Sequence, residues 1–161
     1  PGLGKLPEAP LAMPAVIILI TSAGGAFGAM LRNAGVGDAI KSVAVTYSID
    51  LLLLAWTTAF VIRVAQGSAT VAMITASAIL WPMIDPAVNA PLAFNPMYVF
   101  LSIGFGAFGC SWMNDSGFWV VSKLGGLTEQ ETLRSWTVLA TVLSVSGLIL
   151  TFIASRVLPL V

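Results

Sequence analysis

Four long apolar stretches set the pattern of the chain. None of them contains an Asp, Glu, Lys or Arg, and they cover residues 9–31, 64–84, 86–114 and 135–155. Each has at least 21 residues, and a helix of about 20 apolar residues crosses a hydrocarbon core of roughly 30 Å. The pattern predicts an all-α fold, a polytopic membrane helix bundle.

A polar break that contains a glycine divides the middle of the chain. The apolar runs on its two sides, residues 51–62 and 71–84, would be only about 18 Å and about 21 Å long as helices. Irregular backbone at membrane depth is tolerated only where protein buries it or where it lines a cavity. Short, broken or re-entrant helices around residues 66–70 are therefore typical of a transporter binding site. Two ordinary spans joined by a tight turn at Gln66 and Gly67 fit the same pattern.

Arg63 lies near the end of the first short helix, which is predicted over residues 48–66. Its long side chain would reach the membrane interface, or it would face the interior and meet an anionic substrate, because charged residues inside a membrane are functional by default. A guanidinium binds a carboxylate through two parallel hydrogen bonds. Both interpretations stay open. Asp50, in the first turn, is expected to stabilise the helix N-terminus.

A second polar break, Asn114-Asp115-Ser116-Gly117, lies between Trp112 and Trp119. Four hydrogen-bonding residues in a row between apolar segments predict a second interruption at or near membrane depth. An ordinary surface turn has the same chemistry.

Capping patterns mark other helix ends. Thr128 and Glu131 have the spacing of a capping box, so a helix is expected to start there and to continue into the last span, about residues 135–156. Asp38 is a plausible N-cap for a short helix in the loop 32–47. Residues 1–10, with three prolines, are expected to form an extramembrane linker ahead of a membrane domain over residues 11–161.

The basic residues predict which loops face the cytoplasm. Loops 32–47 and 123–134 contain Lys and Arg and are expected inside, whereas loop 85–96 contains neither and is expected outside. Residues 48–84 would then cross the membrane an odd number of times, which favours one full crossing plus a re-entrant segment.

Composition excludes several classes of function. The chain is 58% hydrophobic and only 9% charged, whereas about a quarter of the residues of a soluble domain are charged. Seven basic residues balance seven acidic ones, so no nucleic-acid partner is expected. The chain has no histidine and one cysteine, Cys110, which excludes a His-based metal site, a His-dependent catalytic set and an internal disulfide. No metal or cofactor is expected, and an intramembrane enzyme is a remote alternative.

The two polar breaks also carry a family resemblance. Residues 63–72 and residues 114–119 resemble segments of the gluconate:proton symporter (gluconate permease) family. Three further segments are similar to that family in the same order, namely residues 23–28, 35–39 and 127–137.

The resemblance implies a multi-pass transporter of the bacterial inner membrane that imports gluconate, or a related sugar acid or small hydroxy acid, by proton symport. It also implies that the chain is the C-terminal portion of a longer protein. The expected partners are thus the small anionic substrate, protons, the lipid bilayer and the missing N-terminal half, and a homo-oligomer stays open. The alternative function is a non-transporting membrane subunit, or an inactive fragment that acts as a helix-packing scaffold.

A sugar acid offers one carboxylate and several hydroxyls, and polar groups at the two breaks suit both. Helix-start N–H groups, hydroxyls and a guanidinium hold carboxylates, and side-chain amides pair with hydroxyls. The expected substrate-binding residues are Arg63, Gln66, Gly67, Ser68, Thr70, Asn114 and Ser116. Without histidine, proton coupling falls to a buried carboxylate, because burial favours the protonated form. Asp115 is the first choice and Asp38 the second.

Overall fold

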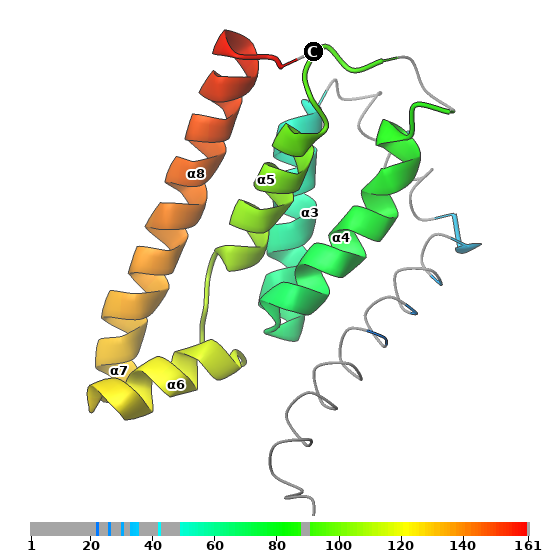
Figure 1. Cartoon of the computed structure of the whole chain (residues 1–161). Helices are drawn as coiled ribbons and strands as arrows, with labels where there is room; N and C mark the ends of the chain where they lie inside the picture. The colour runs from blue at the N-terminus through cyan, green and yellow to red at the C-terminus, as the bar shows by residue number, and fades with distance from the viewer. Residues whose placement is uncertain are drawn as a thin grey trace, which may run out of the picture.

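Helices joined by short connections build the part of the chain that the computed structural model describes (Figure 1). These residues are 49–87 and 91–160, with the isolated positions 22, 26, 30, 33–35 and 42. The elements of the two long ranges are α3 (Leu51–Gln66), α4 (Ala69–Ile84), α5 (Met97–Phe108), α6 (Ser116–Gly125), α7 (Glu129–Thr132), the π-helical segment η2 (Leu133–Thr137) and α8 (Val138–Val157). No strand occurs in these ranges, so the all-α prediction is confirmed for them. The linker 1–10, most of the first span, and Asp38 lie outside the described residues.

The described helices differ sharply in length. One of them, the continuous helix Glu129–Val157 that comprises α7, η2 and α8, has 29 residues and is long and apolar enough to cross a membrane. α3 and α4 have 16 residues each and α5 has 12. These correspond to about 24 Å and about 18 Å, shorter than a hydrocarbon core of roughly 30 Å. The prediction of short helices on both sides of the first polar break is confirmed.

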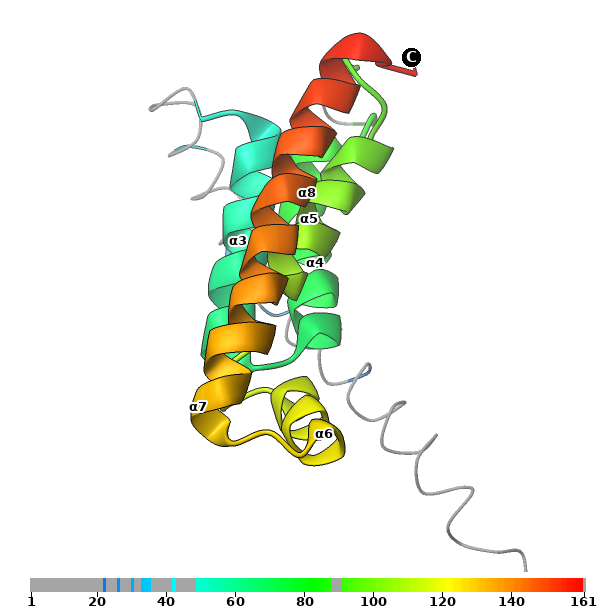
Figure 2. The same ribbon diagram turned by 90° about the vertical axis from the view of Figure 1, so that its left-hand side faces the viewer.

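α3 and α4 form a hairpin because the sequence supplies a helix stop and a helix start in two successive residues. Gly67 follows α3 with a φ of 74°, and its N–H donates to the carbonyl oxygen of Arg63. This left-handed conformation is one that glycine adopts without penalty. Ser68 then caps α4, since its Oγ accepts a hydrogen bond from the N–H of Val71 at 3.3 Å. Figures 1 and 2 show the tip of this hairpin beside α6.

α5 lies in the middle of the bundle, in contact with α3, α4 and α8. Its buried Val99 and Ile103 belong to one apolar cluster with Ala55 of α3. α3 and α5 approach each other closely at Gly106, where an added Cβ atom would collide with the carbonyl oxygen of Trp56. Small residues at a helix contact allow this approach in a membrane protein.

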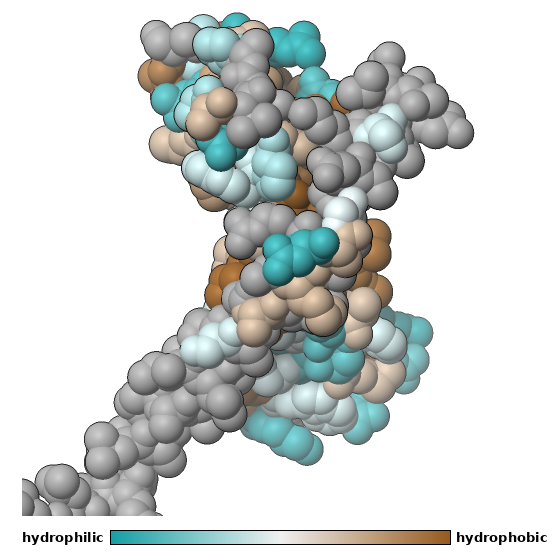
Figure 3. All heavy atoms as spheres, turned by 90° about the vertical axis from the view of Figure 1, so that its right-hand side faces the viewer, coloured by the Kyte–Doolittle hydropathy of each residue, from teal (hydrophilic) through white to brown (hydrophobic). Residues whose placement is uncertain are grey.

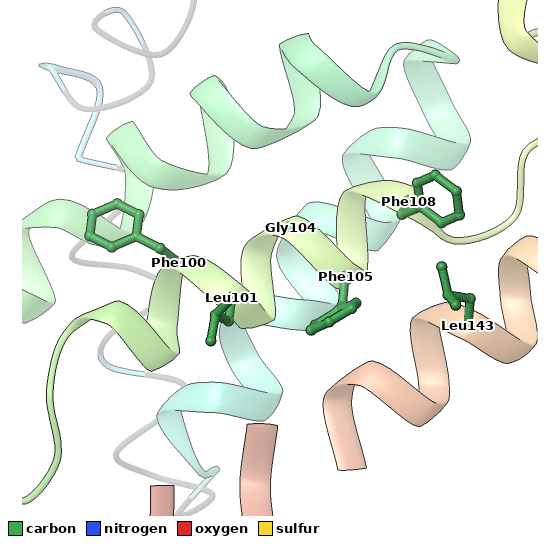
Figure 4. Close-up of a pocket in the computed structure, with 6 residues that line it drawn as sticks. All are labelled: Phe100, Leu101, Gly104, Phe105, Phe108 and Leu143. Carbon is green, nitrogen blue, oxygen red and sulfur yellow. The ribbon is translucent and has the colours of Figure 1, made fainter. Parts of the chain in front are cut away.

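The contact between α5 and α8 combines close packing with hydrogen bonds. Gly147 faces the ring of Phe105. Trp56 Nε1 donates to Ser144 Oγ at 3.0 Å, and that hydroxyl donates to the carbonyl oxygen of Phe105 at 2.6 Å. Beside this contact lies an apolar groove of about 290 Å³ (Figure 4), lined by Phe100, Leu101, Gly104, Phe105, Phe108 and Leu143.

The start of α3, residues 85–87 and 91–96, and residues 157–160 lie at the same end of the bundle. Arg156 Nη2 is 3.8 Å from Asp50 Oδ2, and the N–H of Asn95 donates to the carbonyl oxygen of Pro159 at 2.8 Å. The start of α3 and the end of α4 therefore lie at the same end of the bundle. The prediction that residues 48–84 cross the membrane an odd number of times is wrong. The prediction relied on few charges and left out Arg156, a basic residue at the end that holds the basic-free loop.

Exposed charged residues gather at the opposite end, on the surface of α6, α7 and η2; they are Lys123, Glu129, Glu131 and Arg134. On the face shown in Figure 3, most of the apolar surface lies between hydrophilic residues at the two ends. The capping box is confirmed here, because Glu131 Oε2 accepts from the N–H of Thr128 at 2.8 Å and Thr128 Oγ1 accepts from the N–H of Glu131 at 3.3 Å. The helix that starts there continues into the last span, as predicted.

Candidate functional site

The two polar breaks, about 50 residues apart in the sequence, meet at the tip of the α3–α4 hairpin. An added Cβ atom at Gly67 would collide with the backbone of Asn114. Asn114 Nδ2 also donates to the carbonyl oxygen of Val64 at 2.8 Å, and Trp112 Nε1 donates to the same oxygen at 3.3 Å. The backbone of the hairpin tip is thereby fixed against the segment that connects α5 to α6. We call this contact region the tip junction, comprising residues 63–70 and 111–117.

Two helix N-termini begin at the tip junction. α4 starts after its cap, Ser68. α6 starts after Asp115, whose Oδ1 accepts from the N–H of Gly117 at 2.9 Å. The first turns of both helices carry backbone N–H groups that are not used within the helix, and the helix dipoles add partial positive charge there. The tip junction is therefore suited to an anion.

A buried ion pair joins the two breaks. Arg63 Nη2 bonds Asp115 Oδ2, and the residues are only 5% and 6% exposed. Arg63 Nη1 donates to the carbonyl oxygen of Gly67 at 2.6 Å, across the hairpin turn. Among the described residues, no other Asp, Glu, Lys or Arg is buried. The structure thus selects the inward orientation of Arg63 over an extended side chain at the interface.

Arg63 has an unused donor in this buried position. Its Nε is buried and has no hydrogen-bond partner. Nearly all buried polar groups in folded proteins are hydrogen-bonded, so an orphaned donor beside two helix N-termini is an unusual feature. Nε and Nη2 of a guanidinium lie on one edge, where a carboxylate binds through both of its oxygens.

Asp115 is surrounded by donors. Its carboxylate accepts from Arg63, from the hydroxyl of Ser111 and from the N–H of Gly117. These contacts favour the ionised form of the carboxylate. They oppose the effect of burial, on which the choice of Asp115 as a proton carrier was based. In the arrangement described here, Asp115 is the partner of a cation.

Residues at the start of the long helix hold Ser111, which in turn bonds Asp115. Trp136 Nε1 donates to Ser111 Oγ at 2.8 Å, and the Thr137 hydroxyl donates to the carbonyl oxygen of Ser111. Trp136 and Thr137 belong to the π-helical segment η2, and such segments are frequent at functional sites. Sequence reasoning missed Ser111 and Trp136 as site residues. No spacing rule connects them, because their contact depends on how α5 and α8 pack.

The other predicted substrate-binding residues all lie at the tip junction. The side chains of Gln66, Thr70, Asn114 and Ser116 are exposed, and Ser68 is half-buried. These exposed amides and hydroxyls belong to the same two segments as the buried ion pair. Asp38 lies outside the described residues, and the structure does not place it relative to this site.

Comparison with known proteins identifies the family. The chain matches the model of the GntP family permeases over residues 3–157. It is 44% identical to a gluconate permease of Pseudomonas aeruginosa over 156 residues, which cover 96% of this chain and 33% of the relative. It is 40% identical to the inner membrane permease YgbN of Escherichia coli over 141 residues, 86% of this chain and 30% of that protein.

A third relative has a different named substrate. The D-serine transporter DsdX of Escherichia coli is 38% identical over 142 residues, which cover 88% of this chain and 31% of DsdX. The chain thus spans about a third of the length of these relatives. No solved structure matches the chain. The match over almost its whole length shows that the chain belongs to the GntP family of permeases, polytopic transport proteins of the bacterial inner membrane.

Proposed function

We propose that the chain forms part of a secondary active transporter that imports gluconate, or a related sugar acid or small hydroxy acid, by proton symport. The names of the relatives support this substrate class, because gluconate and D-serine are both small, polar and carboxylate-bearing. Since the chain spans about a third of those relatives, the remaining residues of the longer protein complete the transporter.

The single observation that carries the proposal is the convergence of two helix N-termini on a buried arginine with an unused N–H group. Arg63 Nε and the first N–H groups of α4 hold the substrate carboxylate, assisted by the hydroxyls of Ser68 and Thr70. Gln66, Asn114 and Ser116 hydrogen-bond the hydroxyl groups of the substrate, because amides and hydroxyls both donate and accept.

Proton coupling is assigned to Asp115, the one buried carboxylate among the described residues. Asp38 is the second candidate. A buried acid beside a substrate carboxylate suits this role, because two neighbouring carboxylates favour protonation of one of them.

Uptake of labelled gluconate into membrane vesicles by the full-length parent tests the binding site. Thr70→Val removes an exposed hydroxyl at the tip junction with little change in volume. We expect it to raise the KM for gluconate several-fold and to leave the maximal rate within about twofold, because it removes one hydrogen bond of about 1 kcal/mol. Thr57→Val, which alters a hydroxyl bonded within α3, is the control. Equal effects of the two substitutions would contradict the assignment of the tip junction as the substrate site.

A further inference from the structure

We propose that the Arg63–Asp115 ion pair is an exchange switch, in which the entering carboxylate displaces Asp115 from Arg63 and the displaced carboxylate takes up the proton that accompanies the substrate. The inference rests on the proposed function for the nature of the ligand. It adds the order of events and the reason that anion and proton move together.

The first step follows from the geometry of the guanidinium. Nη1 is held by the Gly67 carbonyl oxygen and Nη2 by Asp115, while Nε has no partner. A ligand carboxylate that binds the Nε–Nη2 edge gains two parallel hydrogen bonds. Asp115 Oδ2 already bonds Nη2, so a ligand on this edge places its carboxylate against the same nitrogen, and the two carboxylates compete for the positive charge of one guanidinium. A protonated carboxyl group is a weaker acceptor than a carboxylate, so protonation of Asp115 leaves the ligand as the anionic partner of Arg63.

The second step follows from charge. The ion pair is neutral before the ligand enters, and a ligand carboxylate adds one negative charge to a site whose residues are about 5% exposed. Two carboxylates beside one guanidinium repel each other, and burial adds to the cost of the second negative charge. Protonation of the Asp115 carboxylate, by one proton from solution, restores neutrality. The liganded site then holds one cation, one anion and one neutral acid.

None of the helices that surround Asp115 offers another buried carboxylate that could accept this proton. α4 and α5 contain no Asp, Glu, Lys or Arg, and α8 contains only Arg156, at the far end of the bundle. The charged residues of α6, α7 and η2 are exposed; they are Lys123, Glu129, Glu131 and Arg134. Among the described residues, no second carboxylate lies in the interior.

Ser111 is a positioning residue for the exchange. Its hydroxyl accepts from Trp136 Nε1 and donates to Asp115 Oδ2. The indole donor therefore directs the hydroxyl hydrogen towards the carboxylate, which favours ionised Asp115 in the empty site. Ser111→Ala removes that donor. The ionised carboxylate of Asp115 then loses a hydrogen-bond donor, so Asp115 takes up its proton at higher pH. We expect the pH dependence of gluconate binding to shift to higher pH accordingly.

Calorimetric titration of the purified full-length parent in lipid nanodiscs with gluconate tests the exchange. Titrations in buffers of different ionisation enthalpy give the number of protons taken up on binding. We expect about one proton per gluconate, and an affinity that falls about tenfold per pH unit while empty Asp115 is ionised and liganded Asp115 is protonated. Sorbitol, which has no carboxylate, should cause no proton uptake.

Asp115→Asn should bind gluconate without proton uptake and with an affinity independent of pH, while Glu131→Gln, which alters an exposed acid, should behave like the parent. Where Asp115→Asn does not fold, Asp115→Glu serves instead, and it should keep the proton uptake but shift its pH midpoint. Proton uptake that persists in Asp115→Asn, an unshifted midpoint in Asp115→Glu, or binding by the parent without proton uptake would overturn the exchange. Failure of the parent to bind gluconate would instead overturn the proposed function and the exchange with it.

Discussion

Arg63 joins two segments of the described structure that are far apart in the sequence. Its guanidinium bonds the hairpin turn at Gly67 and the cap of α6 at Asp115. The sequence places it near a helix end with two open orientations, and only the packing of α6 against the hairpin decides between them. Charge and position could be read from the sequence, whereas the partner, 52 residues away, could not.

The buried ion pair predicts an asymmetry in stability. Arg63→Gln leaves the Asp115 carboxylate buried without its cation, which we expect to destabilise the protein by about 3–5 kcal/mol. Arg156→Gln breaks the Arg156–Asp50 contact, whose side chains are 74% and 36% exposed, and should cost no more than about 1 kcal/mol. Unfolding of the detergent-solubilised full-length parent and its variants measures both. Equal losses would show that the ion pair joining the two breaks is not buried.

Gly67 combines a left-handed backbone with close packing, and the two effects can be separated. Gly67→Ala must accommodate both a φ of 74° and a Cβ atom against Asn114, whereas Gly126 has a φ of 63° with open space around it. We expect Gly126→Ala to cost about 1 kcal/mol, the usual penalty of this conformation, and Gly67→Ala to cost at least about 2 kcal/mol more.

Thermal unfolding of both glycine variants, together with gluconate binding, checks this expectation. Gly67→Ala should also weaken binding, because the tip must move away from Asn114. Indistinguishable variants would mean that the hairpin tip is not packed against the second break.

At the scale of elements, local signals predicted the ends of helices well. The capping box at Thr128 and the end of the first short helix at Gln66 are confirmed. Asp50 was expected in the first turn of a helix over residues 48–66 and instead caps α3 from the position before Leu51, and the Ser68 cap of α4 was not predicted. These signals act within four residues, so a single sequence contains them. The return of α4 alongside α3 matches the alternative of two helices joined by a tight turn at Gln66 and Gly67, which the sequence left open; each of these helices has only 16 residues.

The α3–α5 contact predicts opposite effects for two glycines in the same helix. Gly106→Ala places a Cβ atom against the carbonyl oxygen of Trp56, while a Cβ atom at Gly104 meets nothing within 4 Å. Gly104→Ala should stabilise α5 by about 0.5–1 kcal/mol through helix propensity. Gly106→Ala should destabilise the bundle by about 1–3 kcal/mol through overpacking.

Melting temperatures of the two α5 variants, measured side by side in the same detergent, decide this point. The sign of the difference is informative, since propensity alone predicts the same gain at both positions. A gain at Gly106 would show that α3 and α5 do not approach each other as described.

At the scale of the whole molecule, composition alone indicated a membrane protein, and the family match confirms it. In the described ranges, the charged residues lie at the two ends of the bundle and at the tip junction. The outward face of α8 is apolar, with Val142, Ile149 and Ile153 more than half exposed. Such a face is suited to an apolar environment.

The arrangement of the site was only partly predictable at this scale. The two breaks could be recognised because polar residues interrupt apolar runs, and their order matched a family. Their meeting depends on the packing of α5 beside α3, a contact between distant parts of the chain. The assignment of Asp115 as the proton-coupling residue stays a prediction. The sequence supported it by burial alone, whereas the pairing with Arg63 supports it by competition between two carboxylates for one cation.

Gradient-driven accumulation of gluconate by the full-length parent, compared with Asp115→Asn in the same vesicles, is the most direct test of the central claim that Asp115 couples transport to protons at the tip junction. We expect the variant to exchange internal for external gluconate but not to accumulate it when a proton gradient is imposed. Accumulation equal to that of the parent would show that Asp115 carries no coupled proton and is not the coupling residue.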